Sequence, residues 1–334
     1  MNAPKKRSPF AIVRRLIILV RPMLPVMLAA IAMGVAGYFC ATFITIFGGF
    51  GLLAAAGLES PIPSVGTVFA CILVFALLRG VLRYAEQASN HSIAFKLLAL
   101  IRDRVFGALR RLTPAKLEGR DRGDLISLIT ADIEQLEVFY AHTISPVCIA
   151  VVCVVGMTCF TARYHLLPAL VLLAGYLLVG AALPVWSARR GDKAAHAYRQ
   201  TLADTNSYML ENLRGLWDTL QYQDTANRAE GIAAHSEALG EKQKTLKYRE
   251  GVTVGATNTL ILLTVLAVLG VSLHLYQNGA LDASGVLVCT LAALSSFGPV
   301  VALANLGASL TQVFASADRV LDLLDEEPVT ADVT

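Results

Sequence analysis

Four polar residues stand in an otherwise apolar stretch and could bind a charged ligand. They are Arg79, Arg83, Glu86 and Asn90, and their spacing of four, three and four residues places them along one face of a helix. A charge at the centre of a bilayer costs about 2.5–3.5 kcal/mol on insertion scales, so such groups face protein, water or a partner. We interpret them as a polar stripe along a cavity, where the arginines would attract an anionic group such as a carboxylate.

The same arginines allow a simpler interpretation. At the mouth of a helix, long arginine side chains can reach the lipid phosphates of the inner leaflet. Arg83 can also pair with Glu86, which follows it by three residues. Under this interpretation the residues stabilise the helix end and bind no substrate, and both interpretations agree with the spacing.

Other chemistries find little support in the sequence. The apolar runs contain no nucleophile–base pair and no metal-ligand spacing, which argues against a membrane enzyme. The basic residues flank apolar runs and form no separate basic domain, which argues against nucleic-acid binding. The cysteines form no Cys-x-x-Cys pair, so we interpret them as small apolar residues, with a redox or metal role as the weaker alternative. They are Cys40, Cys71, Cys148, Cys153, Cys159 and Cys289.

The composition is typical of a membrane protein. Of the 334 residues, 55% are apolar and 16% are charged, and the mean hydropathy is +0.59, whereas soluble domains carry about 25% charged residues. A membrane span needs roughly 20 apolar residues to cross about 30 Å of hydrocarbon. The apolar runs predict six spans, at Met23–Phe47, Val65–Leu82, His142–Thr161, Leu166–Trp186, Val254–Tyr276 and Gly285–Leu306.

The distribution of lysine and arginine predicts the orientation of these spans. Of the 28 Lys and Arg residues, only Arg163 lies in the external loops that six spans create. The positive-inside rule therefore places both termini and two long loops, 83–141 and 187–253, in the cytoplasm. Residues 8–20 predict an amphipathic helix that lies on the inner membrane surface.

The two long loops predict helical hairpins that continue pairs of spans into the cytoplasm. Both loops show helical periodicity, and both carry turn residues near their middle. At about 1.5 Å per residue, an arm of roughly 25 residues would be about 35–40 Å long. We interpret the hairpin tips as docking elements for a soluble partner, with simple helix–helix turns as the alternative. The tip residues are Pro114, Ala115, Lys116, Leu117, Glu118, Arg214, Gly215, Leu216, Trp217 and Asp218.

Prolines in or near the spans predict kinks, because proline has no backbone N–H and leaves a carbonyl without its helical partner. The residues concerned are Pro146, Pro168, Pro184 and Pro299. In the last span, Gly298 and Pro299 together are a candidate hinge between two conformations.

The layout resembles the transmembrane domain of type I ABC exporters. That resemblance implies an all-α membrane protein, a six-helix domain with two long cytoplasmic hairpins, which works as a dimer and exposes its cavity alternately to each side. The hairpin tips would then be the coupling helices that receive motion from nucleotide-binding domains. The motifs that carry the resemblance are Gly123-Asp124-Leu125-Ile126-Ser127, Thr130-Ala131-Asp132-Ile133-Glu134, Ala315-Ser316-Ala317-Asp318-Arg319-Val320 and Leu323-Leu324-Asp325-Glu326-Glu327-Pro328.

Within that superfamily the chain looks most like the CydC/CydD exporters of cytochrome bd assembly. The resemblance implies a thiol substrate such as cysteine or glutathione, and it makes His91 a candidate haem ligand. The family pattern has an arginine four residues before that histidine, where this chain has Gln87, so one cation for a haem propionate is missing. The matching runs are Arg83-Tyr84-Ala85-Glu86, Asn90-His91, Ala94-Phe95, Tyr140 and Ile144-Ser145-Pro146.

The resemblance divides the chain into three parts. Residues 1–21 would form an interfacial elbow helix, residues 22–325 the six-span domain, and residues 326–334 the start of a linker to a nucleotide-binding domain. The sequence contains no Gly-x-x-x-x-Gly-Lys-Ser/Thr loop to cradle the phosphates of ATP and no Leu-Ser-Gly-Gly signature, so it cannot hydrolyse ATP by itself. ATP and Mg²⁺ would therefore be held by a nucleotide-binding domain beyond residue 334 or in a separate chain.

These features predict a multi-pass subunit of the cell (inner or plasma) membrane that pairs with a second half-transporter, in a homodimer or a heterodimer. The lipid bilayer is its other partner, and no cofactor is expected in the chain itself apart from haem. Export of a lipid, drug or peptide is the alternative within the family. A non-transporting membrane scaffold or regulator is the alternative from another class.

Overall fold

The computed structural model describes residues 7–62, 64–113, 122–304 and 306–328. These residues are almost entirely helical and contain no β-strand. Among them, six helices are long and apolar enough to cross a membrane. The predicted all-α fold with six spans is therefore confirmed. The six candidate spans are Phe10–Ala55, Val65–Leu112, Gly123–Ala162, Leu166–Ala188, Thr225–Gln277 and Ala283–Ala304.

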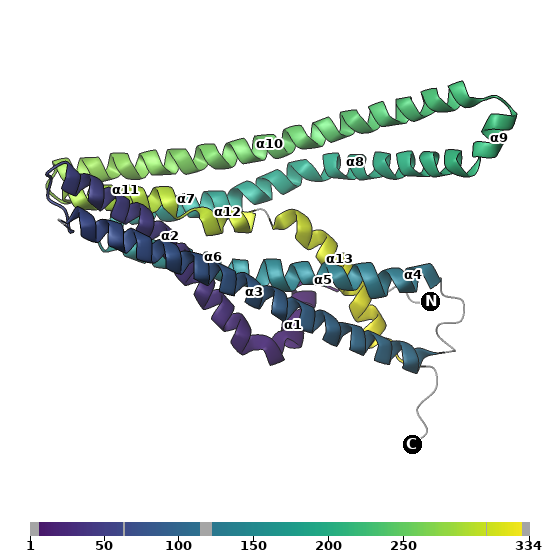
Figure 1. Cartoon of the computed structure of the whole chain (residues 1–334), viewed down its shortest axis with the longest axis horizontal. Helices are drawn as coiled ribbons and strands as arrows, with labels where there is room; N and C mark the ends of the chain where they lie inside the picture. Colours follow the sequence, from purple (N-terminus) through teal and green to yellow (C-terminus); the bar gives the residue numbers. More distant parts are fainter. Residues whose placement is uncertain (1–6, 63, 114–121, 305, 329–334) are drawn as a thin grey trace, which may run out of the picture. The chain divides into compact units, whose positions relative to one another are not determined.

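The described elements follow one another as shown in Figure 1, and their bounds are as follows. Through the third candidate span, the elements in chain order are α1 (Pro9–Val20), η1 (Arg21–Met23), α2 (Leu24–Ala55), α3 (Val65–Leu112), α4 (Arg122–Ser127), η2 (Leu128–Asp132), α5 (Ile133–Phe139), η3 (Tyr140–Ile144) and α6 (Ser145–Ala162). The elements after it are α7 (Leu166–Leu177), η4 (Leu178–Ala182), α8 (Leu183–Arg214), α9 (Leu216–Gln221), α10 (Thr225–Gln277), α11 (Ala283–Ser295), α12 (Gly298–Ala304) and α13 (Gly307–Asp325).

The chain forms two compact units. The first comprises Met1–Tyr176 and Leu263–Thr334, and the second comprises Leu177–Leu262. In the first unit, α2 packs along α3 and against α6 and α11, while α13 packs against α3 and α5. The beginning and the end of the chain thus share one folded body.

Short polar side chains define where several helices begin. Ser8 accepts a hydrogen bond from the backbone N–H of Ala11 at 3.3 Å, and Asp282 accepts one from Gly285 at 2.8 Å. Such N-caps satisfy backbone donors that have no partner inside the helix. α1 occupies the segment where the sequence predicts a surface helix, and its place at the membrane surface stays a prediction.

Three of the four predicted prolines lie where the spans depart from regular α-helix, whereas Pro168 lies in the first turn of α7 and the irregular segment η2 has no proline after it. Pro146 and Pro184 each follow a π-helical segment, η3 and η4 respectively. Because proline cannot donate to the carbonyl four residues earlier and clashes with it, the preceding turn widens. At Pro299 the effect is larger, since α11 ends at Ser295 and α12 begins at Gly298. The last span is therefore interrupted.

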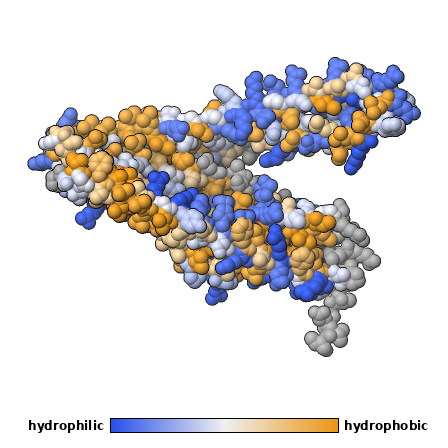
Figure 2. Space-filling model, viewed as in Figure 1, coloured by the Kyte–Doolittle hydropathy of each residue, from blue (hydrophilic) through white to orange (hydrophobic). Residues whose placement is uncertain are grey.

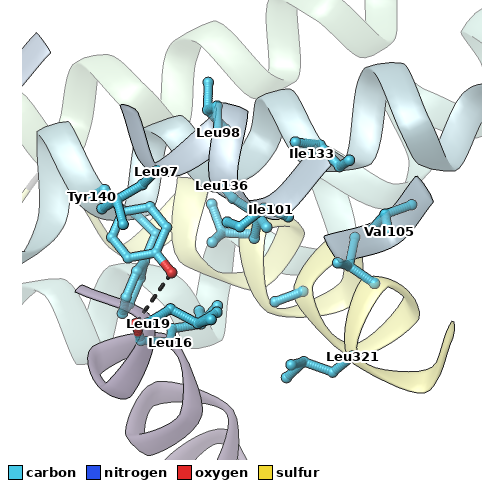
Figure 3. Close-up of a cluster of buried hydrophobic side chains, with 14 of the residues drawn as sticks. Leu16, Leu19, Leu97, Leu98, Ile101, Val105, Ile133, Leu136, Tyr140 and Leu321 are labelled. Atoms are coloured by element: carbon cyan, nitrogen blue, oxygen red, sulfur yellow. Dashed lines mark hydrogen bonds between the residues drawn. The ribbon is translucent and has the colours of Figure 1, made fainter. Parts of the chain in front are cut away.

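A large apolar core joins the N-terminal helix α1 to α3, α5 and the last helix, α13 (Figure 3). Leu16 and Leu19 of α1 lie against this core, and the hydroxyl of Tyr140 donates a hydrogen bond to the backbone carbonyl of Leu16 at 3.2 Å. Burial of such side chains stabilises the body by about 1.5–3 kcal/mol each. Its most deeply buried members include Leu97, Ile101, Val105, Ile133, Leu136, Val313 and Ala317.

The Tyr140 hydrogen bond predicts a modest loss of stability in the Tyr140→Phe variant. Tyr140 is only 2% exposed, so removing its hydroxyl deletes a hydrogen bond that water cannot replace. We expect a loss of about 1 kcal/mol of unfolding free energy, measured by thermal unfolding of the purified protein in detergent. Tyr84→Phe is the matched control, because Tyr84 is 78% exposed and should leave the midpoint unchanged. Equal midpoints for both variants would contradict the role of this bond.

The N-terminal segment is also held to α13 by ion pairs. Arg7 binds the carboxylates of Asp318 at 2.9 Å and Asp325 at 3.0 Å, and it also pairs with Asp322. Arg15 pairs with Asp325 as well. The hydrogen bond from Arg15, followed by the charges of both arginines, holds the pKa of Asp325 below its usual range. Asp325 therefore stays ionised at neutral pH and is matched by cations.

The second unit contains the second predicted hairpin. Between its two arms, the ring of Tyr208 in α8 stacks on that of His235 in α10 with centroids 4.2 Å apart. The hydroxyls of Ser187 and Thr253 hydrogen-bond at 2.8 Å. α9 joins the arms at the tip, and hydrophilic residues dominate this arm in Figure 2. The hairpin predicted for residues 187–253 is thus present.

Candidate functional site

The predicted polar stripe on α3 is divided between buried and exposed residues. Glu86 is 3% exposed and Asn90 is 2% exposed. Arg83 Nη1 lies 2.6 Å from Glu86 Oε2, which confirms the predicted ion pair. Asn90 donates to Glu86 at 3.4 Å and accepts from the hydroxyl of Ser145 at 2.8 Å. A chain of polar contacts therefore runs from Arg83 into the protein and links α3 to α6.

The packing around Glu86 depends on a glycine in α2. A Cβ placed on Gly34 would collide with Ile149 of α6 and lie 3.2 Å from the carboxyl carbon of Glu86. A side chain at this position would force the end of the Ile149 side chain to shift. Glu86 is thus held by three helices, and it orients the Arg83 guanidinium, whose side chain remains 52% exposed.

Arg79 is exposed and lies one turn before Arg83, so these two arginines are the part of the stripe that a ligand can reach. The guanidinium of each can bind a carboxylate through two parallel hydrogen bonds. The arrangement can therefore hold an anion, with Arg83 fixed in position by Glu86 and Arg79 free to adjust. Glu86 and Asn90 lie inside the protein, where Asn90 hydrogen-bonds Glu86 and Glu86 holds Arg83 in position.

His91 lies in a small cluster next to the stripe. Its Nδ1 is 3.5 Å from Glu137 Oε1, and its ring contacts the rings of Phe95 and His142 with centroids 6.0 and 5.7 Å apart. A haem would need the imidazole as ligand and cations for its propionates. The Glu137 carboxylate could hold Nδ1 and leave Nε2 for iron. Gln87, however, stands where a cation for a propionate was expected, so the cations do not fit haem and we derive no step through it.

A second buried carboxylate was not predicted from the sequence. Asp132 is 2% exposed, and its Oδ1 accepts hydrogen bonds from Ser316 at 2.9 Å and from Arg319. Its Oδ2 has no hydrogen-bond partner among the described residues. Asp132 and Arg319 both belong to motifs that carry the family resemblance. The charged residues in these motifs were the available signal for a polar contact. Nothing in the sequence indicates that Asp132 pairs with Arg319.

The two hairpin tips differ in what the structure describes. The first tip, Pro114 to Glu118, lies outside the described residues. At the second, Gly215 ends α8 and α9 follows as a short helix with its apolar side chains exposed. Trp217 is 77% exposed and Tyr222 is 78% exposed. Beside them, a cavity of about 240 Å³ is lined by residues including Glu211, Asp218, Asp224 and Arg228.

The candidate hinge lies at the interruption of the last span. Beyond α11, Ser296 hydrogen-bonds the hydroxyl of Tyr176, and the ring of Phe297 lies against Tyr176 with centroids 4.9 Å apart. A Cβ on Gly298 would lie 3.1 Å from the ring of Tyr38. The interruption is therefore anchored to α7 and α2, and bending at Gly298 and Pro299 stays a prediction.

Comparison with known proteins agrees with this architecture. The sequence pattern of the family described as ABC transporter transmembrane region matches residues 22–300. A probable ABC transporter ATP-binding/permease protein of Haemophilus influenzae is 36% identical over 328 residues, which cover 98% of this chain and 59% of the relative. The glutathione/L-cysteine transport system ATP-binding/permease protein CydC of Escherichia coli is 29% identical over 276 residues, covering 76% of this chain and 44% of the relative.

The CydC protein of Haemophilus influenzae is 23% identical over 293 residues, which cover 84% of this chain and 50% of that relative. The chain thus spans about half the length of the curated relatives it matches. The names of these relatives join an ATP-binding part to a permease part.

Proposed function

This chain belongs to the ABC transporter transmembrane family, and from that premise we propose that it forms the membrane-spanning part of an ATP-driven exporter that works by alternating access. Residues 22–325 would form the translocating domain, and residues 326–334 would lead toward the nucleotide-binding domain. That domain would supply ATP and Mg²⁺ binding, in the same polypeptide or in a partner. A second half-transporter would complete the assembly in the cell membrane, with both termini in the cytoplasm.

The observation that carries this proposal is the exposed apolar surface of α9. Leu216, Trp217 and Leu220 are 52%, 77% and 52% exposed on a six-residue helix at the tip of a largely hydrophilic hairpin. Exposed aromatic residues at the end of a polar arm are typical of a protein-binding element, because burying them on a partner removes apolar area from water. A coupling helix that docks on a nucleotide-binding domain needs this surface.

We propose a small substrate that carries a carboxylate group, with a thiol compound such as cysteine or glutathione as the first candidate. The exposed guanidiniums of Arg79 and Arg83 suit a carboxylate, which both compounds carry. The two CydC relatives are named for glutathione and L-cysteine transport. Lipid, drug or peptide export is the second candidate within the family, because the relative with 36% identity is named without a substrate.

The test is ATP-dependent uptake into inverted membrane vesicles that contain the chain together with its nucleotide-binding domain. We expect labelled cysteine or glutathione to accumulate only with ATP, and Arg79→Gln to weaken the apparent affinity for the anion about tenfold. Arg163→Gln, in the predicted external loop, is the matched control and should leave affinity unchanged. Equal affinities in both variants would contradict the anion site.

The same experiment separates the remaining functions. Accumulation of a lipid or peptide in place of a thiol would contradict the proposed thiol substrate and still support the exporter function. No ATP-dependent movement of any of these substrates, in vesicles where the nucleotide-binding domain copurifies with the chain, would contradict the exporter and favour a scaffold or regulator. For His91, a Soret spectrum with added haem that is the same in wild type and His91→Ala is the expected result.

A further inference from the structure

A cavity of about 820 Å³ lies in the first unit, away from the polar stripe on α3. Its walls come from α1, from the end of α3 and from the end of α13, which are held together by the core around Leu16 and Ile101. This volume lies within the range of about 300–1,000 Å³ that small-molecule sites occupy. The residues lining it are Arg15, Ile18, Leu19, Asp103, Arg104, Gly107, Arg110, Arg111, Leu321, Leu324 and Asp325.

The lining is rich in arginine. Arg104 and Arg111 lie seven residues apart, two helical turns along the same side of α3, with Arg110 beside them. Among the described residues, none of these three arginines forms an ion pair. Arg15, the fourth arginine, pairs with Asp325, which is also bound by Arg7. The positive charge that remains for a ligand is therefore carried by the three arginines of α3.

Asp103 is the one acidic lining residue without an ion pair among the described residues, and it offsets one of these three charges. Two positive charges remain. A phosphate group carries one or two negative charges and three or more acceptor oxygens, and arginine forks bind such groups through paired hydrogen bonds. The charge and the donors therefore both match a phosphate.

Gly107 leaves the space between the arginines open. It lies between Arg104 and Arg111 on α3, and a Cβ placed on it would meet no atom within 4 Å. A larger side chain at this position would therefore occupy the cavity without colliding with the protein. A substitution of Gly107 can therefore fill the cavity without changing the charge of its lining.

The rim of the cavity is apolar on the side of α1. Ile18 lines the cavity and is 60% exposed, and its neighbours Phe10 and Ile17 on the same helix are 80% and 47% exposed. Helix α1 therefore exposes apolar side chains next to the arginines of α3. A ligand that joins a phosphate to an apolar chain fits both surfaces, and an anionic phospholipid is such a ligand.

We propose that this cavity binds a phosphate group, with the headgroup of an anionic phospholipid as its source. The arginines of α3 hold the phosphate, and Ile18 and Leu19 lie against the start of the acyl chains. Because α13 supplies Leu321 and Leu324 to the same cavity, the bound lipid joins the first cytoplasmic arm to the last helix. The site involves neither ATP nor the transported substrate.

The test measures lipid binding to the full chain in detergent by native mass spectrometry. Phosphatidylglycerol is titrated against phosphatidylcholine, and glycerol 3-phosphate is titrated alone. We expect wild type to retain phosphatidylglycerol in preference to phosphatidylcholine, and the double variant R104Q/R111Q to bind it roughly 10- to 30-fold more weakly. Raising the salt concentration should weaken wild-type binding as well.

Two variants probe the cavity without changing its charge. Gly107→Leu should abolish the preference for phosphatidylglycerol by filling the space. Gly240→Leu is its matched control, because a Cβ on the exposed Gly240 also meets no atom within 4 Å, and it should bind as wild type does. R199Q/K242Q on the second unit controls for the loss of two charges. Thermal midpoints of all variants identify any that fail to fold.

Several outcomes would overturn the proposal. Equal retention of both lipids by wild type would contradict an anionic phospholipid as the ligand, because the two lipids share the phosphate and differ in the net charge of the headgroup. Equal weakening by R104Q/R111Q and R199Q/K242Q would show that net charge, and not this cavity, attracts the lipid. Tight binding of glycerol 3-phosphate alone, lost in Gly107→Leu, would keep a phosphate site and reject the lipid as its source.

Discussion

Replacing Trp217 with alanine is expected to remove most ATP-driven transport while the fold stays intact. Trp217 is 77% exposed on α9, so the chain itself loses little packing when the indole is removed. A docked partner would lose a large aromatic anchor. Such anchors are worth about 2 kcal/mol or more in protein interfaces, which corresponds to roughly 30-fold weaker docking.

Two measurements check this expectation. Copurification of the nucleotide-binding domain with the chain should fall in Trp217→Ala, and ATP-dependent uptake in vesicles should fall with it. Tyr248→Ala is the matched control, because Tyr248 is 74% exposed on α10 of the same unit but lies far along the helix from the tip. If both variants retained full docking and uptake, α9 would not be a coupling helix.

Arg319→Met is expected to cost about 2–3 kcal/mol of unfolding free energy. The substitution removes the cation that pairs with Asp132, whose carboxylate is 3% exposed and already has one oxygen without a hydrogen-bond partner among the described residues. Removing one partner of a buried pair leaves an uncompensated charge and costs about 3–5 kcal/mol. The Arg319 side chain is 54% exposed, so solvent screens part of the interaction. We therefore expect a cost of about 2–3 kcal/mol, below the range for a fully buried pair.

Arg102→Met provides the comparison for this variant. Arg102 lies 3.7 Å from Glu134, and their side chains are 43% and 64% exposed. Exposed pairs of this kind contribute less than about 1 kcal/mol, so thermal unfolding should be nearly unchanged. Adding Asp132→Asn to Arg319→Met should recover part of the stability, because the amide carries no charge to bury. Similar midpoints for the two arginine variants would show that Asp132 is not buried in the folded protein.

The sequence was sufficient to predict the features that depend on local patterns. Apolar runs of span length predicted the six candidate spans, and the three-residue spacing of Arg83 and Glu86 predicted their ion pair. Pro146, Pro184 and Pro299 predicted the irregular turns, because the steric effect of proline acts within one turn of the same helix.

Features that depend on packing between distant segments could not be predicted in this way. Asp132 and Arg319 are 187 positions apart, so only the folded core brings them together. Whether Glu86 faces a cavity or the protein interior depends on Gly34 and Ser145, which belong to two other helices. Periodicity assigns a residue to a face of its own helix, but not to the helices that cover that face.

The ion pairs of Arg7 also bear on biosynthesis. Its acidic partners lie 311 to 318 positions later, so a ribosome delivers them long after Arg7 has been synthesised. Until then Val313, Ala317 and Val320 are absent from the core, and the side of α1 that packs against α13 in the folded protein is not covered by it. Nascent chains that stop before α13 would therefore expose apolar residues of this core to membrane proteases, and synthesis of α13 would remove that exposure.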